Sequence, residues 1–449
     1  MEVSYTRSLP VKYTADVFVA GGGPAGLAAA ISCARQGRSV FLAESYSALG
    51  GAAVTMLVPM FMDFTDGVHF LAGGFGQEVY DAIKREALPK FRRFCPKAIP
   101  AETLKIIYDD MVTEAGVQFL FHTNVMDAVV ENGKIQYVVC AAKGSTFAVK
   151  ANIYIDCTGD GDLSYYAGAG WEYGDENGRT MATTLCGLWT AIDWSRVVVS
   201  DKSRLDDAFA DNVFTNKDRH LVGIKRIMEE SKDANGVSVP NGFGGSNAGH
   251  IYDVDARYSE SLTEGLIKGR KQLLEFRRYY KEYLPGFEET ELVSTAPYLG
   301  IRESRRIECD YRLVLDDFIR QAVFDDEIGR YAYNIDIHSS TNDQAGYENF
   351  MKEHTTFCYK DGESYGIPYR ALTVKGIDNL LTAGRCIGSD RYMQSSVRVM
   401  PGCYITGQAA GIAAAVVCDA HGENVHEADV REIQKRLVKI GGYLPNFRS

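Results

Sequence analysis

A glycine-rich turn near the start of the chain constrains its fold more than any other feature. Residues 15–20 are mostly apolar, Gly21, Gly23 and Gly26 follow, and residues 27–37 are rich in helix formers and end at a glycine. This order predicts a strand, a tight turn and a helix. In such a unit the first glycine permits the turn, the second leaves room for a pyrophosphate, and the third lets the helix pack on the strand. The phosphates then meet the free N–H groups of the helix N-terminus.

A second apolar run supports the same interpretation. Residues 39–43 predict a strand that ends at Glu44, 23 positions after Gly21. This is about where a dinucleotide-binding unit places an acid for the ribose hydroxyls. Because the strand, turn, helix and acid agree, we expect a dinucleotide site here and not an accidental glycine turn. The motif alone does not say which dinucleotide binds.

Composition and charge narrow the class of protein. A length of 449 residues is enough for two or three domains, and 46% hydrophobic and 24% charged residues are typical of a globular protein. The net charge of −11, with no long basic run to offset it, argues against a nucleic-acid partner. We expect the densest basic stretch, residues 268–278, to be a solvated helix face. No apolar run approaches the ~18 residues of a membrane span, and the longest, residues 409–418, predicts a buried helix.

The cysteines argue against metal and dithiol chemistry. Ten are spread singly, and no pair has the Cys-x-x-Cys spacing of a zinc site, an iron–sulfur cluster or a redox dithiol. We therefore expect no metal. No charged-then-apolar leader precedes the first strand, so we expect a cytoplasmic location.

The pattern of elements divides the chain into three segments. Residues 1–161 predict a Rossmann-like parallel sheet with a β-meander, and this rhythm returns in residues 361–449. Residues 162–360 are richer in aromatic and charged residues and predict an inserted α+β substrate domain with long helices. The expected fold class is α/β.

Within these segments, several elements can be predicted from short patterns. Residues 102–116 predict a helix; residues 117–121, 124–130, 135–140 and 147–151 predict strands, and the apolar run 153–159 follows. Asn132-Gly133 is typical of a hairpin turn. After Arg385 we expect a polar loop and then the last major helix, beginning near Pro401, whose small residues suit close packing against another element.

Seven stretches together resemble the FAD-dependent oxidoreductases of the glutathione-reductase-like superfamily, most closely the branch of fumarate reductase and succinate dehydrogenase flavoproteins. The stretches are residues 17–26 with Glu44, then 50–53, 155–162, 299–307, 334–338, 365–370 and 379–415. They occur in the family's order and span nearly the whole chain. The resemblance implies an FAD-binding domain formed jointly by the N- and C-terminal segments, with a β-rich middle segment covering the flavin.

The resemblance also implies a set of cofactor contacts. The glycine turn would meet the pyrophosphate, the acid after the second strand the adenosine ribose, and later segments the adenine and the ribityl chain. The residues are Gly21, Gly23, Pro24, Ala25, Gly26, Glu44, Ser45, Gly50, Gly51, Ala52, Val125, Thr158, Gly159, Gly384, Arg385, Ser396 and Arg398. Arg385 stands where many relatives carry an acid. No histidine lies in residues 50–56, where some relatives attach FAD covalently, so we expect non-covalent FAD.

Three residues are candidates for the chemistry. Arg302 lies in a basic cluster, and fumarate-reductase relatives use arginine to bind carboxylates and deliver protons; the alternative is a structural ion pair. His338 could exchange a proton near neutral pH, or could be a hydrogen-bonded wall residue. Arg398 precedes the last helix, where it and the helix N-terminus would stabilise negative charge on a reduced flavin; the alternative is a structural carboxylate partner.

Three further residues are weaker candidates or are assigned to packing. His250 follows a glycine-rich polar loop and is a weaker candidate for proton exchange. Tyr369 could donate to a substrate oxygen, although a core position is favoured. For Cys386 we expect a buried, non-reactive position.

The sequence therefore predicts an FAD-dependent oxidoreductase that transfers a hydride between a polar small molecule and non-covalently bound FAD. The aromatic residues Trp171, Tyr173 and Trp189 of the middle segment suggest a ring-like or carboxylated substrate. The alternatives are a nicotinamide-dependent dehydrogenase and a non-catalytic protein that uses the scaffold for binding. The substrate, the electron donor or acceptor, the direction of reaction and the oligomeric state remain open at this stage.

Overall fold

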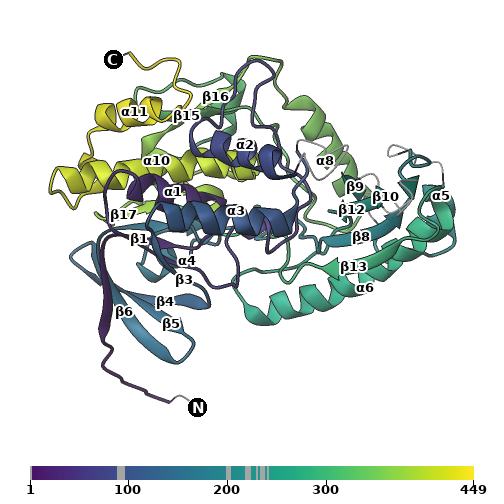
Figure 1. Ribbon diagram of the computed structural model, residues 1–449, viewed down its shortest axis with the longest axis horizontal. Coiled ribbons are helices and arrows are strands. Elements are labelled where there is room, and N and C mark those ends of the chain that lie inside the picture. The colour runs from purple at the N-terminus through teal and green to yellow at the C-terminus, as the bar shows by residue number, and fades with distance from the viewer. Residues whose placement is uncertain are drawn as a thin grey trace.

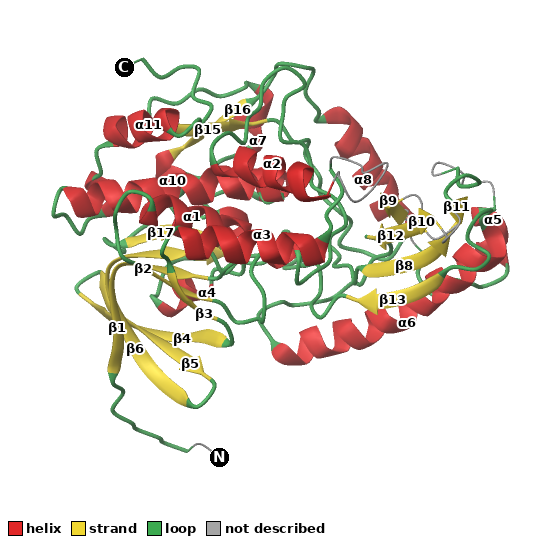
Figure 2. Cartoon of the chain, in the orientation of Figure 1, coloured by secondary structure: helices red, strands yellow, loops and turns green. Residues whose placement is uncertain are grey.

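One mixed sheet organises the fold, and Figure 1 and Figure 2 show it at the lower left of the computed structural model. The structure describes residues 3–87, 97–198, 204–217, 224–228, 231–232, 238–239 and 242–448. The strands of this sheet are β1 (Val11–Ala20), β2 (Val40–Ala43), β3 (Gln118–Leu120), β4 (Thr123–Glu131), β5 (Lys134–Ala142), β6 (Ser145–Asp156) and β17 (Leu380–Thr382). Their order is β3-β2-β1-β6-β5-β4, with β17 also paired to β6. Parallel pairing joins β3, β2, β1, β6 and β17, and antiparallel pairing joins β6, β5 and β4. The predicted Rossmann-like sheet with a meander is therefore confirmed.

The helices around this sheet come from both ends of the chain. They are α1 (Pro24–Ala34), α2 (Phe75–Ala87), α3 (Ala101–Glu114), α4 (Asp162–Tyr166), α9 (Arg391–Val397), α10 (Met400–Asp419) and α11 (Val430–Lys439), with short 3-10 helices η1 (Gly51–Ala53), η2 (Tyr369–Ala371), η3 (Gly384–Cys386) and η4 (Val425–Glu427). Figure 1 shows α1, α3 and α10 together above the sheet. A single hydrophobic core joins residues of β1, α1 and α10. The two ends of the chain thus share one core.

Small residues let α1 and α10 approach closely. A Cβ atom added to Gly407 would lie 2.1 Å from the carbonyl oxygen of Ala25, and one added to Gly411 would lie 2.1 Å from that of Ala29. The expectation that the last helix packs closely is confirmed, and its partner is α1. Among the described helices only α10 is long and apolar enough to cross a membrane, and that stretch is entirely buried inside the protein.

Two local predictions need correction. The apolar runs 147–151 and 153–159 were expected as separate segments, but the first and the start of the second form one strand, β6. Lys150 and Asn152 are exposed between buried neighbours, which is the alternation of one continuous strand. The polar loop expected after Arg385 contains the helix α9, whose N-terminus is capped because the Asp390 side chain accepts a hydrogen bond from the Met393 N–H. The hairpin prediction is confirmed, since Asn132 and Gly133 both have positive φ, 52° and 76°.

The middle segment contains a second sheet with its own core. Its strands are β8 (Gly187–Ile192), β9 (Ile224–Met228), β12 (Gly242–Ser246) and β13 (Glu291–Thr295), in the antiparallel order β13-β8-β12-β9, and the helices α5 (Leu205–Ala210) and α6 (Ser259–Tyr283) belong to the same part. Figure 1 shows this part at the right, with α6 along its edge. Trp189 is fully buried in this core and donates a hydrogen bond to Ser246 at 2.8 Å, so it is not available to a substrate. The basic stretch 268–278 lies on α6, where its lysine and arginine side chains are exposed or half-buried.

The remaining elements belong to neither of these two sheets. They are β7 (Trp171–Glu172), β10 (Ser231–Lys232), β11 (Ser238–Val239), β14 (Arg306–Ile307), α7 (Leu315–Ile319), β15 (Glu327–Tyr331), α8 (Gln344–Thr356) and β16 (Tyr365–Pro368). The second core draws its middle-segment residues from Leu185 to Ile301. Apolar residues between 313 and 337 instead join the first core, beside α10.

Candidate active site

A cavity of about 480 Å³ lies where the N-termini of α1 and α10 converge, and we call it the central cavity. Its lining comes from both ends of the chain and from the middle segment. The lining residues are Gly23, Pro24, Ala25, Gly51, Ala52, Met56, Val58, Met60, Met62, Cys157, Thr158, Gly159, Lys225, Asn247, Gly300, Ile301, Arg302, Tyr333, Asp336, His338, Phe350, His354, Ala383, Gly384, Arg385, Arg398, Val399, Met400 and Cys403. Ten of the residues predicted to bind the cofactor are among them, as are the three candidates for the chemistry.

One part of the cavity wall consists mainly of backbone, and we call it the backbone end. It is formed by Gly23, Gly51, Gly159 and Gly384, each at a turn that follows or precedes a strand or helix of the first core, with their immediate neighbours. A Cβ atom added to Gly23 would have only the Cα of Gly51 near it, at 3.9 Å, so Gly23 borders open space. No side chain caps α1, which leaves the N–H groups of its first turn available to a ligand.

Gly21 and Gly26 shape this turn without lining the cavity. Gly21 has φ +91°, and a Cβ atom there would lie 2.7 Å from the carbonyl oxygen of Cys157. A Cβ atom on Gly26 would lie 1.8 Å from the carbonyl oxygen of Gly21. These two glycines are required by close backbone packing, while Gly23 is the one that leaves space for a ligand.

Glu44 lies at the end of β2, next to this turn. Its carboxylate accepts hydrogen bonds from the N–H of Gly22 at 2.6 Å and of Tyr46 at 2.8 Å. Burial raises the pKa of Glu44, and these backbone donors oppose the rise. Glu44, Ser45, Gly50 and Val125 do not border the central cavity; Ser45 donates to Glu44 at 3.4 Å.

Arg385 gives this end of the cavity a positive charge. Its Nη2 donates to Asp160 at 2.9 Å, while the buried Nη1 has no hydrogen-bond partner among the described residues. The guanidinium lies against Gly159, where a Cβ atom would be 2.7 Å from Nη2. A buried cationic donor beside free helix N–H groups fits an anionic group such as a pyrophosphate.

Another part of the wall carries charged side chains, and we call it the charged end. It contains Arg302, Asp336, His338 and Arg398. Arg398 Nη2 lies 3.3 Å from Asp336 Oδ2 and donates to the Asp336 carbonyl at 3.1 Å, and its Nε has no partner in the described structure. Arg302 donates to the carbonyl of Ala182 at 2.7 Å and to Asn247 at 3.3 Å.

Mutual charge and burial shift the pKa values of these groups. Burial lowers the pKa of Arg302 to about 10, and the positive charge of Arg398 acts in the same direction. Burial would raise the pKa of Asp336, but His338, Arg398 and Arg302 outweigh it and hold that pKa below its usual range. Burial and Arg302 lower the pKa of His338 well below its usual value, although Asp336 opposes them. At neutral pH the charged end therefore holds the Asp336 carboxylate, two arginine cations and the neutral His338 imidazole.

A second histidine supports His338 from behind. His250 Nε2 lies 2.9 Å from His338 Nδ1, and His250 Nδ1 lies 3.1 Å from the Tyr252 hydroxyl. His338 Nε2 lies 3.5 Å from Asp336 Oδ2. The hydrogen bond to His250 fixes the orientation of the His338 ring and leaves Nε2 toward the carboxylate. His250 was the weaker sequence candidate, and the structure brings it into direct contact with the stronger one.

Some functional residues escaped the sequence prediction. Asp336 and His354 both line the cavity, and His354 Nδ1 lies 3.6 Å from Asp336 Oδ1. The spacing of Asp336 and His338, two residues apart in an extended segment, could have indicated that both point the same way. No sequence pattern indicated His354.

Several other candidates lie outside the cavity. Ser396 is buried in α9 and donates to the Tyr333 carbonyl at 2.5 Å, so it positions a cavity residue. Tyr369 is a core residue that donates to the Val425 carbonyl, and the Cys386 thiol is buried, as expected. Burial raises the pKa of the Cys386 thiol well above its usual value. Trp171 lies outside the lining of the central cavity.

Comparison with known proteins identifies the family. The sequence model of one family, described as FAD dependent oxidoreductase, matches residues 16–437. The chain belongs to this family of FAD-dependent oxidoreductases. The protein is therefore an enzyme, and its cofactor is FAD. The alternatives of a nicotinamide-dependent dehydrogenase and a non-catalytic scaffold are set aside by this membership.

Three solved structures of flavin-dependent or reductase-like proteins are similar to this oxidoreductase at low identity. A geranylgeranyl bacteriochlorophyll reductase-like protein from Thermoplasma acidophilum has 12% identity and a TM-score of 0.44, with 95% of this chain and 83% of that chain covered. The flavin-dependent brominase Bmp2 has 14% identity and a TM-score of 0.43, with 95% and 82% covered. The p-nitrophenol 4-monooxygenase PnpA from Pseudomonas putida has 12% identity and a TM-score of 0.40, with 95% and 84% covered. No curated protein matches the sequence.

Proposed function

We propose that this oxidoreductase binds FAD without a covalent bond in the central cavity and exchanges a hydride with a polar small molecule. The observation that carries the proposal is that one cavity has free helix N–H groups and Arg385 at one end and a buried acid–base cluster at the other. A dinucleotide needs the N–H groups and the positive charge for its phosphates, and proton-coupled redox chemistry needs the acid–base cluster.

The backbone end would hold the pyrophosphate. Gly23 leaves the space, the first turn of α1 supplies N–H donors, and Arg385 supplies positive charge. Glu44 would accept from the adenosine ribose, and Val125 would offer backbone groups to the adenine. Non-covalent attachment is supported by the absence of histidine from residues 50–56. The cavity thiol of Cys403 supports it too, because burial raises its pKa to about 12 and keeps the sulfur protonated and poorly nucleophilic.

The charged end would act on the substrate and on the redox partner. When bound, FAD supplies the centre that accepts or gives the hydride. Arg398 and the uncapped N-terminus of α10 would stabilise the negative charge that accompanies reduction. His338 is neutral at pH 7 and can relay a proton between His250 at Nδ1 and the Asp336 carboxylate at Nε2, while His250 holds its ring in place. Arg302 would orient a polar group of the substrate through the guanidinium edge that its two protein partners leave unused.

The relation to fumarate reductase and succinate dehydrogenase flavoproteins belongs to the same proposal. It is supported by the order of the seven sequence stretches and by Arg302 in the cavity wall. We also propose that residues 1–161 and 361–449 together form the FAD domain and that residues 162–360 form the substrate domain. The nine described cysteines are all free, which supports a cytoplasmic location.

The spectrum and redox behaviour of the purified protein test this proposal. It should be yellow, and acid or heat should release intact FAD into the supernatant; flavin that stays with the precipitated polypeptide would contradict non-covalent binding. The protein should be mixed anaerobically with a panel of sugars, polyols and organic acids. We expect one class of these compounds to reduce the flavin and bleach its absorption. If no polar compound of the panel reduces the flavin, and none reoxidises chemically reduced protein, the proposed hydride exchange is wrong.

A further inference from the structure

A second, larger cavity of about 950 Å³ adjoins the central cavity, and we call it the polar cavity. Its lining combines the loop after β7, the segment from His338 to Thr341, α8 and the first turn of α9. His338 and Phe350 line both cavities, and their rings stack with centroids 5.0 Å apart. A ligand in the polar cavity would therefore lie beside the His338 ring.

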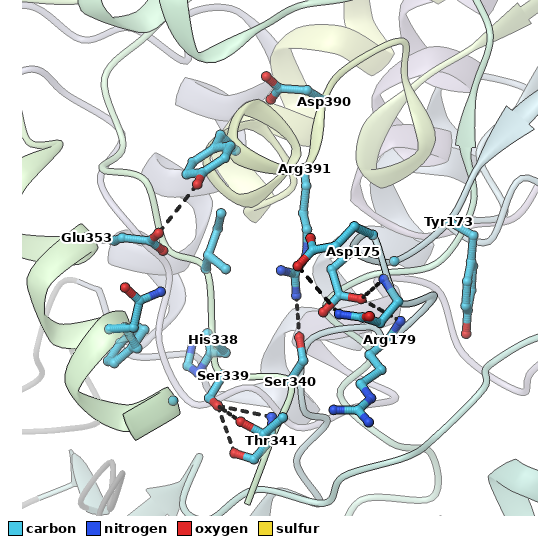
Figure 3. A pocket seen from close by; sticks show the side chains of 18 of the residues that line it. Tyr173, Asp175, Arg179, His338, Ser339, Ser340, Thr341, Glu353, Asp390 and Arg391 are labelled. Atoms are coloured by element: carbon cyan, nitrogen blue, oxygen red, sulfur yellow. Dashed lines mark hydrogen bonds between the residues drawn. The ribbon is translucent and has the colours of Figure 1, made fainter. Parts of the chain in front are cut away.

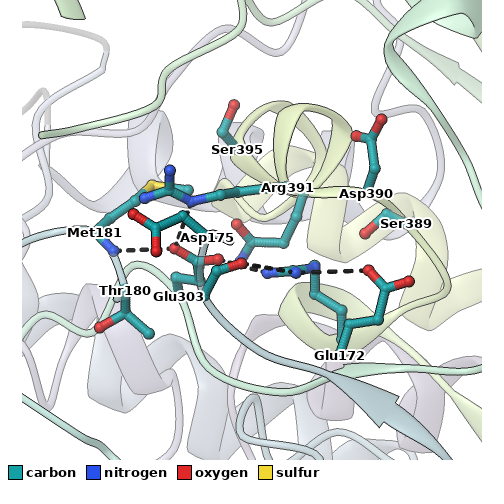
Figure 4. A network of polar contacts seen from close by, with 12 residues as sticks. Glu172, Asp175, Thr180, Met181, Glu303, Ser389, Asp390, Arg391 and Ser395 are labelled. Atoms are coloured by element: carbon teal, nitrogen blue, oxygen red, sulfur yellow. Dashed lines mark hydrogen bonds and ion pairs between the residues drawn. The ribbon is translucent and has the colours of Figure 1, made fainter. Parts of the chain in front are cut away.

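Two arginines of the polar-cavity lining, Arg306 and Arg391, belong to a buried ion-pair network around Glu303, and we call these residues the floor of the cavity; Figure 4 shows Glu303 and Arg391 in this network. Glu303, which is 2% exposed, accepts hydrogen bonds from Arg306 at 2.5 Å, from Arg391 at 3.0 Å and from the Met181 N–H at 2.9 Å. Arg391 also donates to the Ser340 hydroxyl at 2.6 Å. Arg306 also lies 3.6 Å from Glu172 Oε2. The two arginines therefore face two carboxylates, Glu303 and Glu172, and the floor offers a fixed polar surface with paired charges.

Around this floor, several polar groups have unused hydrogen-bonding capacity, and Figure 3 shows some of them facing one another across the hollow. The Arg179 guanidinium and the Asn349 amide have no hydrogen-bond partner within the described structure. Glu353 Oε1 accepts from the Tyr392 hydroxyl at 3.4 Å, which leaves Oε2 free among described groups. Asp175 Oδ1 accepts hydrogen bonds from the N–H groups of Asn177 and Arg179, and its Oδ2 has no hydrogen-bond partner among the described residues. Both donors and acceptors are thus available.

This mixture selects the chemical class of the ligand. A dianion would meet the carboxylates of Asp175 and Glu353, and an amine would meet the Arg179 guanidinium. A hydroxyl group donates and accepts at once, so a molecule with several hydroxyls can use both kinds of partner without a net charge. Desolvating a neutral hydroxylated molecule also costs less than desolvating an ion.

We propose that the polar cavity binds a neutral polyhydroxylated ligand, a sugar or a polyol, as the outer part of the substrate site. This inference rests on the proposed function and names its substrate class. Glu353 and Asp175 accept from ligand hydroxyls, Arg179 and Asn349 donate to them, and the Glu303 network holds Ser340 and Arg391 in place beneath. The ring of His338 closes the inner side.

Calorimetric titration of the FAD-loaded enzyme tests the ligand class. The probes are D-glucose, cellobiose and myo-inositol, with succinate and putrescine as charged comparators. Neutral probes should bind, and Glu353→Gln or Arg179→Gln should each weaken the binding about tenfold, the loss expected for one hydrogen bond to a charged group. The matched control is Glu348→Gln on the same helix, whose side chain lies outside the cavity lining and should leave binding unchanged.

The possible results separate this inference from the proposed function. Binding of succinate or putrescine without any neutral probe, no neutral binding at all, or equal binding by the two cavity variants and the control overturns the inference. If a compound of another class bleaches the flavin at the same rate in wild type and Glu353→Gln, the hydride exchange stands and the inference falls. If a sugar binds as expected while no compound of any class alters the flavin spectrum, the ligand class stands and the proposed function falls.

Discussion

The two ends of the central cavity are built in different ways. At the backbone end, helix N–H groups and glycine turns form the wall, and only Arg385 adds a charged side chain. At the charged end the wall is a cluster of ionisable side chains, in which the neighbouring charges shift the pKa values of Arg302, Asp336 and His338. The first end depends on close backbone packing, and the second on charge balance.

This difference predicts different responses to substitution. A side chain added at the backbone end, or between the helices that support it, either meets fixed backbone atoms or fills the space of the cofactor, and should abolish folding or cofactor binding. A change at the charged end leaves the space open and should shift a potential or a pH dependence. Four predictions test this contrast, beginning with the largest expected effect.

The contact between α1 and α10 should be the most sensitive to substitution. In Gly411→Ala, the new Cβ would lie 2.1 Å from the Ala29 carbonyl oxygen, a backbone atom, so the helices must separate. We expect the free energy of unfolding to fall by about 3 kcal/mol or more, measured by urea denaturation. Gly422→Ala is the control, since its nearest atoms lie at 3.4 Å. Equal stability of the two variants would show that this packing is adaptable and would weaken the contrast.

A substitution at Gly23 should weaken cofactor binding without unfolding the protein. Its backbone is extended, with φ −71° and ψ −173°, and the nearest atom to an added Cβ is 3.9 Å away, so the protein itself can accept a side chain. Gly23→Val should retain its fold but bind FAD about 100-fold more weakly, because the branched side chain fills the proposed pyrophosphate space. Flavin fluorescence titration gives the affinity, and circular dichroism checks the fold. Normal FAD affinity in this variant would place the pyrophosphate elsewhere.

Most of the backbone end could be predicted from the sequence, because its signals are local. The strand, the glycine turn and the helix of residues 15–34 follow one another directly, and each position has one steric requirement. The start of α10 was equally predictable from Pro401. The continuity of β6 was missed because the polar Asn152 interrupts an apolar run, although it faces solvent within one strand.

The charged end could be predicted only in part, because long-range folding assembles it. His250 and His338 are 88 positions apart, and nothing in the sequence pairs them. Arg302, Arg305 and Arg306 look alike in sequence, but Arg305 pairs with Asp162 and Arg306 with Glu303, while Arg302 lines the cavity. The sequence of α9 is mostly polar and therefore predicted a loop. Buried contacts of this segment with the first core, which the sequence does not show, stabilise it as a helix.

Arg398 and Asp336 should move the flavin potential in opposite directions. Arg398→Leu removes a cation from the cavity and leaves the Asp336 carboxylate uncompensated, so the potential should fall. A loss of about 2–4 kcal/mol, by analogy with oxyanion donors, corresponds to about 40–90 mV for two electrons. Asp336→Asn should raise the potential, and Arg398→Lys should restore part of the loss, since lysine keeps the charge without the planar fork.

Potentiometric titration of wild type and the three variants measures these shifts, with bound FAD quantified in each sample. An unchanged potential in Arg398→Leu would make the Arg398–Asp336 pair purely structural and leave charge stabilisation to the N-terminus of α10. In that case the charged end, like the backbone end, would stabilise negative charge through backbone N–H groups.

The smallest effect concerns the pH dependence of stability. Burial and Arg302 hold the pKa of His338 well below 6.5, against the opposing charge of Asp336 and beside the ring of His250. A histidine in the unfolded chain titrates near 6.5. Below that pH, His338 therefore binds a proton in the unfolded chain but not in the folded protein. The free energy of unfolding should therefore fall as pH drops below about 6.5, by at most about 1.4 kcal/mol per pH unit for one proton.

His338→Gln should make this slope shallower, because glutamine has no proton to bind in either state. Urea midpoints at pH 7.5, 6.5 and 5.5 for both proteins give the two slopes, and this range lies above the pH at which Asp336 would begin to titrate. Identical slopes would mean that His338 is protonated as easily in the folded protein as in the unfolded chain. It could then not be the neutral imidazole that distinguishes the charged end from the backbone end, and a proton would have to pass through another group of the cavity.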